Sequence, residues 1–567
     1  MEGILDSISS SVANLAKKEL RDRARYAFSS QRTPQGGRPA GRRRSLWSLY
    51  RERKKRIGYL LGIDIGTSGC RAVIFDENFA LQGKAAFSFA LDVPRPQWAE
   101  QDPDRVLSGV LRVIRQCLKK TGMAPRDLLG IGLSGVLYSL LAIDSKGRPL
   151  LPLIQWSDNR AEEESSRLDQ AFRAADLYRK TGCRNNAMYL PAKILWIKEN
   201  LPDLYARTAK FISIKDYVAQ HLTGGDYATD YIVASASGLF NIHEKRWDRD
   251  VLKLLDLAED RLPAAVPPQF LLGTIQRKVA KRTGLLEGTP VYAGGGDGPL
   301  SNVGAGVIEP GHLNLSIGSG GILRMILDRP RLCPFQRTWC YLLKEDRWIL
   351  GGVNNGGMVL QWFWESFWGK ETRREEKRKG RFALLDGWAG SIPPGSEGLI
   401  FLPYLTGERS PNWRTEARAS FLGINSRHHR GHFARSVMEG LGFQMRRVFA
   451  AMEEISGGVK EIRFTGGFST SIFWSQMMSD ILGREALVPR VKESSALGAV
   501  AVAALGIGII PDLVAVKKRV EIERVLSPDR ENHRRYKKLY ELFLDLYEDS
   551  VKGWESLHRV MGAEGRE

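Results

Sequence analysis

The sequence predicts an α/β protein built from two similar domains, and three observations lead to this prediction. Residues 59–76, YLLGIDIGTSGCRAVIFD, show an apolar segment, a small-residue turn and a second apolar segment, which is the pattern of a strand–turn–strand unit. Residues 312–326, HLNLSIGSGGILRMI, repeat this pattern in the second half of the chain. A length of 567 residues is enough for two or three domains with sizeable cores. The repeated unit therefore indicates a duplicated architecture.

The first turn has the residue types of a phosphate-binding loop. It contains small and polar residues, namely Asp64, Gly66, Thr67, Ser68 and Gly69. Glycines let a ligand approach the backbone closely, and successive N–H groups and hydroxyls can donate to phosphate oxygens. Asp64 stands where its carboxylate could hold a hydrated Mg²⁺ ion. The turn is not a Walker loop, because no Gly-Lys-Ser/Thr follows it and it leads into a strand.

The second turn is also rich in small residues, and a basic residue follows each turn. The small residues of the second turn are Ser316, Gly318, Ser319, Gly320 and Gly321. The basic residues are Arg71 and Arg324. Two hairpins, one from each domain, would hold the phosphates of one nucleotide from opposite sides, and closure of the domains would exclude water. We therefore expect a ligand cleft between the two domains.

Four segments of the first half are placed by their patterns. A proline-bounded loop at residues 94–103, PRPQWAEQDP, is followed by a helix with one apolar face. Residues 129–135, LGIGLSG, are predicted as a buried strand, and residues 138–144 as the next strand. Residues 155–160, QWSDNR, suit the wall of a pocket, although Asp158 could equally cap a helix.

Residues 291–298, VYAGGGDG, place Asp297 at the end of a short apolar strand. Catalytic groups often occupy such positions, and one carboxylate is enough to accept the proton of an attacking hydroxyl during phosphoryl transfer. The alternative is an ordinary Asp-Gly turn. The region before this strand has mostly helical patterns.

Further small-residue segments follow in the second half. Residues 350–362, LGGVNNGGMVLQW, are predicted to join a Gly-rich loop to a helix, and residues 464–471, FTGGFSTS, to form a strand and a Gly-Gly turn that accommodates a flat base. Glu493 is expected to cap an apolar, buried helix over residues 496–510. Near the end of the chain, apolar residues recur at helical spacing, which indicates packing: Tyr536, Leu539, Leu542, Phe543 and Leu546.

Composition limits the class of protein. Contents of 43% hydrophobic and 26% charged residues are ordinary for a soluble globular protein. The formal net charge is +20, and residues 1–56 hold 15 Lys and Arg against five Asp and Glu. We expect this segment to be a disordered arm. The functional alternatives for this basic segment are contact with nucleic acid or an anionic membrane, and targeting. The non-functional alternatives are a solvated tail and a start codon assigned too far upstream.

Cysteines and apolar runs exclude two further classes. The five cysteines include no CxxC pair, so we expect neither a zinc site nor a disulfide framework, but a reduced cytosolic protein. The longest apolar run, residues 496–510, is too short to span a bilayer, so no transmembrane segment is predicted.

The ordered set of motifs resembles the FGGY family of carbohydrate kinases. The motifs are DIGTSG, WAEQDP, IGLSG, WSDNR, GGGDG, NNGGMVLQW, FLPYLTGERSPNW, MEGLGF, TGGF and ESSALGA, and they span residues 59–547. The resemblance implies two actin/hexokinase-like (ribonuclease H-like) domains with the ligand cleft between them. Residues 59–308 would be the substrate-side domain and 309–567 the nucleotide-side domain, after a basic arm at 1–58. Within the family, gluconokinases are most similar, and xylulokinases are next.

The resemblance also implies roles for individual residues. Asp297 corresponds to the catalytic base, and Asp64 to the acid that orients Mg²⁺ through water. The substrate-side positions are Trp98, Glu100, Tyr138, Trp156 and Asp158. The ATP-side positions are Thr67, Ser68, Arg71, Ser319, Gly320, Gly357, Gln361, Gly466, Gly467 and Ser471.

Two departures from the family pattern bear on the substrate. Many relatives have a Met-His pair after the SG turn, where the His helps bind the sugar, whereas this chain has Leu137 and Tyr138. Tyrosine can donate a hydrogen bond but cannot carry a positive charge towards a carboxylate. The second hairpin reads GSGG where GTSG is usual, and it keeps Ser319.

We therefore expect ATP-dependent phosphorylation of a hydroxyl of a small sugar or sugar acid in the cytoplasm, with D-gluconate to 6-phosphogluconate as the first candidate. One alternative is a xylulokinase or another ketose or polyol kinase. Another, from a different class, is a catalytically inactive nucleotide-binding sensor. Mg²⁺ is the expected cofactor and ATP the phosphoryl donor. A homodimer is left open, no membrane partner is expected, and nucleic acid would bind only through the basic arm.

Overall fold

The structure is a computed structural model, and it describes residues 58–171, 174–368, 376, 380–491 and 493–564. Apart from Gly58, the basic arm predicted for residues 1–58 lies outside the described residues.

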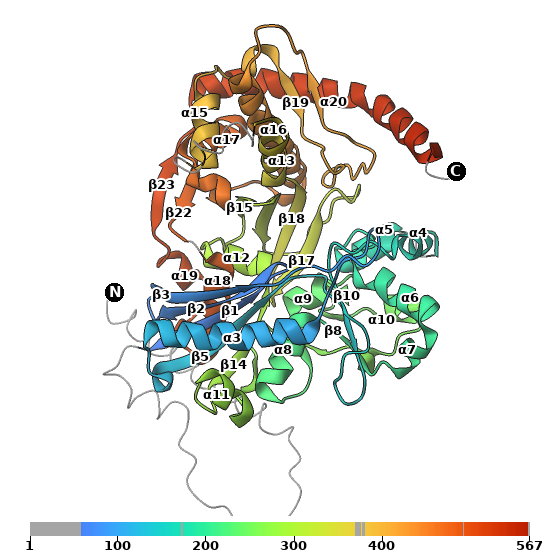
Figure 1. The fold of residues 1–567 in the computed structure, drawn as a ribbon, viewed down its shortest axis with the longest axis vertical. Helices are drawn as coiled ribbons and strands as arrows, with labels where there is room; N and C mark the ends of the chain where they lie inside the picture. Colours follow the sequence, from blue (N-terminus) through green and yellow to red (C-terminus); the bar gives the residue numbers. More distant parts are fainter. Residues whose placement is uncertain (1–57, 172–173, 369–375, 377–379, 492, 565–567) are drawn as a thin grey trace, which may run out of the picture. The chain divides into compact units, whose positions relative to one another are not determined.

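The first half of the chain forms a mixed sheet with the first hairpin at its centre (Figure 1). Among the described residues this sheet has six strands in the order β13-β14-β5-β1-β2-β3. β1 pairs antiparallel with β2 and parallel with β5, and β5 pairs parallel with β14. The strands are β1 (Tyr59–Ile65), β2 (Gly69–Asp76), β3 (Leu81–Ser88), β5 (Leu128–Gly135), β13 (Leu271–Thr274) and β14 (Pro290–Gly296). The hairpin and the buried strand predicted from the sequence are thus confirmed.

The second half forms a larger sheet that repeats this arrangement. Seven described strands follow in the order β17-β18-β16-β15-β21-β22-β23. β15 pairs antiparallel with β16 and parallel with β21, as β1 does with β2 and β5. The strands are β15 (His312–Ile317), β16 (Gly320–Leu327), β17 (Trp339–Lys344), β18 (Arg347–Asn355), β21 (Glu461–Thr465), β22 (Ala486–Pro489) and β23 (Ile522–Leu526). The predicted duplication is confirmed.

The segment predicted as a Gly-rich loop before residue 356 is the second half of β18, so this prediction is wrong. Its glycines serve close packing: a Cβ on Gly351 would collide with the indole of Trp339, and one on Gly352 would lie 2.5 Å from a methyl of Val448. The sequence shows a run of glycines but not the neighbours that require them.

Helices cover the first sheet and build an outer lobe beside it. α3 (Pro103–Thr121) begins at the predicted proline, and the carboxylate of Asp102 caps it by accepting the N–H groups of Asp104 and Arg105. Its predicted apolar face is buried. The other helices of this half are α4 (Glu162–Ala171), α5 (Ala174–Thr181), α6 (Leu190–Asn200), α7 (Pro202–Arg207), α8 (Ile214–Thr223), α9 (Tyr231–Ser235), α10 (Arg249–Leu255) and α11 (Arg277–Thr283).

Short strands complete this half. They are β4 (Glu100–Gln101), β6 (Leu141–Ile143), β7 (Leu153–Ile154), β8 (Lys210–Ile212), β9 (Ala228–Asp230), β10 (Phe240–Asn241), β11 (Arg246–Trp247) and β12 (Ala264–Val266). The strand predicted for residues 138–144 begins only at Leu141, because Tyr138 has a φ of 61° and lies in the turn after β5.

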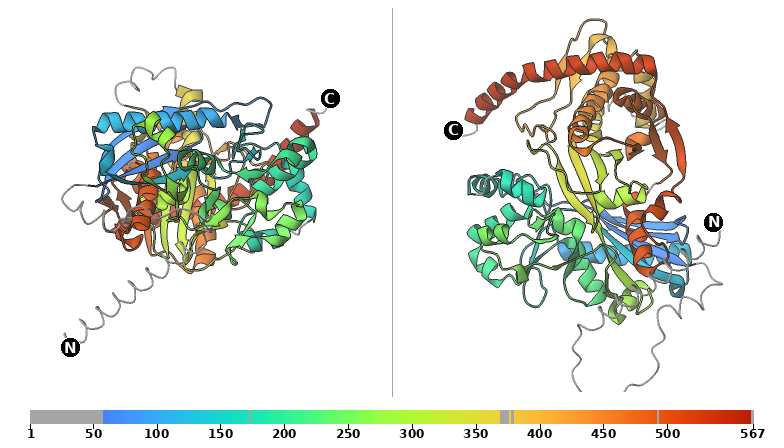
Figure 2. Two further views of the ribbon diagram at one scale, coloured as in Figure 1. Left: turned by 90° about the horizontal axis from the view of Figure 1, so that it is seen from below. Right: turned by 180° about the vertical axis from the view of Figure 1, so that it is seen from behind.

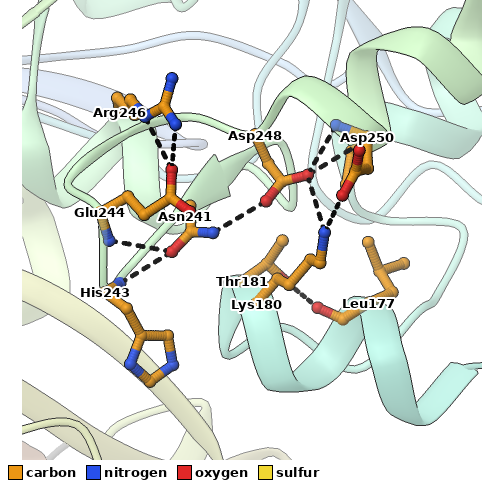
Figure 3. A network of polar contacts seen from close by, with 10 residues as sticks. Leu177, Lys180, Thr181, Asn241, His243, Glu244, Arg246, Asp248 and Asp250 are labelled. Carbon is orange, nitrogen blue, oxygen red and sulfur yellow. Dashed lines mark hydrogen bonds and ion pairs between the residues drawn. The ribbon is translucent and has the colours of Figure 1, made fainter.

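A polar network fixes the end of α5 against the β10–β11 hairpin and α10 (Figure 3). Asn241 Nδ2 donates to Asp248 Oδ2 at 2.9 Å, and Lys180 Nζ lies 3.8 Å from Asp248 Oδ1. Lys180 also pairs with Asp250. Thr181 Oγ1 donates to the carbonyl of residue 177 at 2.8 Å. These contacts hold the segment that follows α5 in a defined place.

The other helices of the second half are α13 (Gly357–Phe363), α15 (Arg381–Gly390), α16 (Arg430–Ser456), α17 (Ile472–Leu482), α19 (Val514–Lys517) and α20 (Arg530–Glu564), with the short pair β19 (Ile400–Leu402) and β20 (Ser420–Leu422). α20 is the long helix at the top of Figure 1 and of the right-hand view of Figure 2. Tyr536 and Phe543 are fully buried, which confirms the predicted packing helix, whereas Leu542 is 44% exposed.

Two helices join the halves, α12 (Asp297–Gly304) and α18 (Ser494–Ile507). α18 follows the second sheet in sequence but packs against α12 and against β1 and β5 of the first sheet. The approach is close, because a Cβ on Gly132 of β5 would collide with the backbone of Ala499. The predicted buried apolar helix is confirmed. In the part of the chain that the structure describes, no helix is both long and apolar enough to cross a membrane.

Candidate active site

Asp64 lies at the end of β1, beside Ser134 at the end of β5. The parallel register pairs these two residues directly, and Ser134 Oγ donates to Asp64 Oδ1 at 2.9 Å. Arg71 Nη1 on β2 lies 3.4 Å from Oδ2. Burial and, to a smaller extent, the negative charge of Asp297 raise the pKa of Asp64 to about 6. The two predicted acidic residues are therefore electrostatic neighbours, although the sequence separates them widely.

The first hairpin turn is tied to the substrate-side segments. Gly66 N–H donates to the carbonyl of Gly69 at 2.9 Å, which closes the turn. The carbonyl of Thr67 accepts a bond from Gln101 Nε2 at 2.6 Å, and Thr67 Oγ1 accepts one from Trp156 Nε1 at 3.0 Å. Ser68, at the tip of the turn, is exposed. The tryptophan-led loop and the QWSDNR segment thus meet at this turn.

Arg160 organises the predicted substrate wall, and sequence reasoning did not single it out. Its guanidinium donates to Glu100 Oε1 at 2.6 Å and to Asp158 Oδ2 at 2.8 Å, and it lies 3.6 Å over the ring of Trp98. Asp158 is completely buried and also accepts the N–H of Ala99 at 2.6 Å. The only sequence signal for Arg160 was its place at the end of the QWSDNR motif. Its pairing with Glu100 was not visible, because Glu100 lies sixty positions earlier in the chain.

Asp297 is the first residue of α12, immediately after β14. Gly298 N–H donates to Asp297 Oδ1 at 2.7 Å, and Ser495 Oγ of α18 donates to the Asp297 carbonyl at 3.2 Å. Burial raises the pKa of Asp297, whereas the positive charge of Arg324 and the Gly298 N–H lower it. Asp297 is thus a carboxylate in a desolvated setting with one guanidinium near it.

The second hairpin turn joins the start of α13. Gly318 N–H donates to the carbonyl of Gly320 at 3.0 Å. Gly357 N–H donates to the Gly318 carbonyl at 2.8 Å, and Met358 N–H to the Ser319 carbonyl at 3.0 Å. The predicted ATP-side residues Ser319, Gly320 and Gly357 are therefore in contact.

The remaining ATP-side residues lie in the turn before α17 and on α13. Gly466 has a φ of 84°, which favours glycine, and Gly467 begins the short turn before α17. Ser471 Oγ caps α17 by accepting the Trp474 N–H at 2.9 Å. Gln361 lies exposed on α13.

Glu493 does not cap α18, so this prediction is wrong. The residue stands at the N-cap position, but its side chain makes no capping bond. Glu493 Oε1 instead lies 2.6 Å from Lys84 Nζ, and Oε2 lies 3.9 Å from Arg71 Nη1. Two cations on β2 and β3 attract the carboxylate away from the helix end. α18 is thereby linked to the first hairpin.

Tyr138 belongs to a buried cluster of tyrosine hydroxyls. Its OH lies 2.9 Å from Tyr341 OH on β17, and Tyr341 OH lies 2.8 Å from Tyr189 OH. Lys193 Nζ donates to the carbonyls of Tyr138 at 2.9 Å and Gln155 at 2.8 Å, which fixes the backbone on both sides of the wall. The Tyr138 hydroxyl is thus already paired across the two halves.

In the described part of the chain, Arg324 and Arg409 lie beside predicted site residues and have no ionic partner, and Arg184, which lies over Trp413, also has none. Within the described residues, the side chains of Arg184, Arg324 and Arg409 make no hydrogen bond and no ion pair. The Arg184 guanidinium lies 5.2 Å from the ring centre of Trp413, and the Arg409 guanidinium 5.5 Å from that of Trp156. Unpaired cations at this site favour a negatively charged ligand.

The acidic residues present fit a magnesium ion held partly by substrate. No group of three or more His, Cys, Asp or Glu side chains suited to a metal occurs in the described ranges. Mg²⁺ in kinases needs no such cage, because one or two carboxylates, water and phosphate oxygens complete its shell. Asp64 is a buried carboxylate with a second carboxylate near it, and a divalent cation would compensate both charges.

Comparisons with known proteins agree with this arrangement. The model of the N-terminal domain of the FGGY family of carbohydrate kinases matches residues 59–304, and that of the C-terminal domain matches residues 313–507. A gluconokinase of Bacillus subtilis is 34% identical over 491 residues, covering 86% of this chain and 95% of that protein. A xylulose kinase of Bacillus subtilis is 28% identical over 493 residues, covering 86% and 96%.

Two solved structures from Lactobacillus acidophilus show the same fold. The ligand-bound xylulose kinase superposes with a TM-score of 0.83 and the gluconate kinase with a TM-score of 0.82, each at 28% identity. Each match covers 88% of this chain and 100% of the other. The predicted two-domain, actin/hexokinase-like fold is confirmed, while these two structures do not separate the two substrates.

Proposed function

Because the chain belongs to the FGGY family of carbohydrate kinases, we propose that this sugar kinase transfers the γ-phosphoryl group of ATP to D-gluconate, giving 6-phosphogluconate. The electrostatic interaction of Asp297 with Asp64, whose pKa it raises, is the observation that carries the phosphoryl-transfer chemistry. The 34% identity to a gluconokinase, against 28% to a xylulose kinase, favours the sugar acid.

Asp297 is proposed as the general base. Its carboxylate must be ionised to accept the proton of the attacking hydroxyl, and burial works against ionisation. The Gly298 N–H and the charge of Arg324 oppose that effect and favour the ionised form that a base requires. The bond to Gly298 also fixes the orientation of the carboxylate, since it engages Oδ1.

The hairpins and Asp64 are proposed to hold the phosphates. The backbone and hydroxyls of Thr67, Ser68, Ser319 and Gly320 supply donors from both domains. Mg²⁺ bound near Asp64 would neutralise charge on the transferring group. Arg71, which bridges Asp64 and Glu493, adds a cation on the same side.

The substrate wall is proposed to consist of Trp98, Glu100, Tyr138, Trp156 and Asp158. Arg160 fixes Glu100 in place, which leaves a rigid carboxylate able to accept bonds from sugar hydroxyls. Trp156 is held by its bond to Thr67 and so links the sugar wall to the phosphate turn. The fully buried Asp158 acts through Arg160 and the backbone rather than by touching the sugar.

A xylulokinase is the second candidate, because the structural match to a xylulose kinase is as good as that to a gluconate kinase. A sensor without turnover is disfavoured, since Asp64 and Asp297 are both present and interact electrostatically.

The test is an ADP-release assay with Mg-ATP across sugar acids, ketoses and polyols. We expect D-gluconate to have the highest kcat/KM and Asp297→Ala to lower turnover by about 10²–10⁴-fold. A pentulose preferred over gluconate by more than about tenfold, equivalent to 1.4 kcal/mol, would replace the substrate and keep the mechanism. Near-normal turnover of Asp297→Ala would contradict the assignment of the base.

A further inference from the structure

Arg324 lies on the face of β16 that carries the second hairpin turn. Burial alternates along the strand: Gly320, Ile322 and Arg324 are partly exposed, whereas the residues between them are buried. Successive side chains of a strand point to opposite faces, so these three share one face. Arg324 therefore lies on the same face of β16 as Gly320, which belongs to the second hairpin turn.

The backbone around Arg324 holds its guanidinium beside Asp297. A Cβ on Gly298 would lie 2.2 Å from Nη2 of Arg324, so the guanidinium packs directly against the backbone next to Asp297. Asn302 Nδ2 of α12 donates to the Arg324 carbonyl at 3.2 Å, and Asn314 Nδ2 of β15 donates to Asn302 Oδ1 at 3.2 Å. The arginine is thus placed by a packed, hydrogen-bonded setting and not by chance exposure.

The guanidinium has no partner where it lies. Its Nε is buried and makes no hydrogen bond within the described residues, and no carboxylate there lies within ion-pair distance of it. Burial lowers the pKa of Arg324, and Asp297 is the one carboxylate whose charge opposes this. A buried donor without a partner is costly and calls for an explanation, such as a ligand that accepts its bond.

The other carboxylates of the site have cations of their own. Arg160 compensates Glu100 and Asp158, and Arg71 lies against Asp64. A neutral sugar would leave Arg324 uncompensated, whereas a carboxylate would match the planar fork of a guanidinium.

We propose that Arg324 binds the carboxylate of a sugar-acid substrate and thereby selects sugar acids over neutral sugars. This inference rests on the proposed function and names the substrate-recognising group. Gluconate is phosphorylated at the end opposite its carboxylate, so its carbon chain would have to run from Arg324 back to Asp297. Because Tyr138 carries no charge and its hydroxyl is paired with Tyr341, the positive charge for the acid comes from the second domain.

The test compares D-gluconate with D-glucitol, which has the same carbon chain and a hydroxymethyl group in place of the carboxylate. For Arg324→Gln, the ratio of kcat/KM for gluconate to that for glucitol should fall by at least about 100-fold, the scale of a lost charge-assisted bond. Arg324→Lys should recover part of the ratio, because it restores the charge but not the fork. Calorimetric titration of gluconate without nucleotide should show the same loss of affinity.

Arg184→Gln is the matched control. It removes the same charge from an arginine that also lacks an ion pair in the described residues, but whose guanidinium lies over Trp413 and near Asp169. It should leave the gluconate-to-glucitol ratio within about threefold, under 1 kcal/mol.

Three results would overturn the inference while the gluconokinase proposal stands. The first is an equal loss of kcat/KM for gluconate and glucitol in Arg324→Gln, which would mean that Arg324 acts only through Asp297. The second is an unchanged gluconate-to-glucitol ratio in that variant. The third is a loss of the ratio when Arg409 is replaced instead. If the wild type acts on another sugar acid, the gluconate proposal fails and Arg324 is tested on that acid and its alditol. Turnover of neutral sugars only would refute both.

Discussion

Replacing Asp64 by asparagine is expected to change stability and catalysis in opposite directions. Burial raises the pKa of Asp64 from 3.8 to about 6, with Asp297 adding to the rise and the Ser134 bond opposing it. Between these pH values the folded protein keeps a proton that the unfolded chain has released. The free energy of unfolding therefore falls as pH rises through this window.

The size of the effect follows from the pKa difference. A rise of about two pKa units corresponds to roughly 3 kcal/mol at 25 °C. Asparagine carries no charge, and its Oδ1 can still accept the bond from Ser134. Asp64→Asn should therefore raise the free energy of unfolding by up to about 3 kcal/mol near pH 7, and by little near pH 4.

Catalysis should change the other way, because the ionised carboxylate is the proposed magnesium anchor. In the wild type, the apparent affinity for Mg²⁺ in the presence of ATP should fall about tenfold per pH unit below pH 6, where Asp64 takes up a proton. Asp64→Asn should bind Mg²⁺ more weakly at pH 7 and lose this dependence. Urea denaturation and Mg²⁺ titrations of the kinase assay at several pH values measure both effects.

Asp144→Asn serves as the control, since Asp144 is a carboxylate whose pKa is lowered by the backbone N–H of Arg148. It should not stabilise the protein at pH 7. The reasoning about Asp64 would be refuted if Asp64→Asn were no more stable than the wild type at pH 7, or stabilised equally at pH 4 and pH 7.

Three further predictions concern the framework of the site. Arg160→Met should lower the free energy of unfolding by about 3–5 kcal/mol, because it leaves the buried Asp158 without its cation. Arg148→Met, which removes an ion pair on the surface, should lower it by less than about 1 kcal/mol, and urea denaturation measures both variants. Burial lowers the pKa of Lys193 to about 7, so between pH 7 and 9 its amine is protonated in the unfolded chain and largely neutral in the folded protein. The free energy of unfolding should therefore rise by up to about 1.4 kcal/mol per pH unit in this range in the wild type, but not in Lys193→Met. Gly132→Val should force α18 away from β5 and reduce both melting temperature and turnover, and a variant with normal values of both would contradict the close packing.

Much of the fold could be predicted because the signals are local. The two hairpins, the helix after Pro103 and the apolar helix α18 follow from residue periodicity and turn chemistry within short segments. The same applies to Asp64 and Asp297, each of which ends an apolar strand beside small residues. The order of the motifs added the family and, with it, the two-domain fold.

The partners of the site residues depended on the tertiary structure. Ser134 reaches Asp64 only through the register of two parallel strands, and Arg160 reaches Glu100 only when two loops meet. Glu493 was expected to cap its own helix, but cations from another sheet attract it. The unpaired state of Arg324 likewise depends on tertiary contacts, because Arg71 and Arg160 pair with Asp64, Glu100 and Asp158. By itself, the sequence determined the strand ends and turns on which the predicted site residues stand, since these are encoded locally. The tertiary structure alone decided which charges are compensated, because electrostatic energy depends on distances between segments that are far apart in the chain.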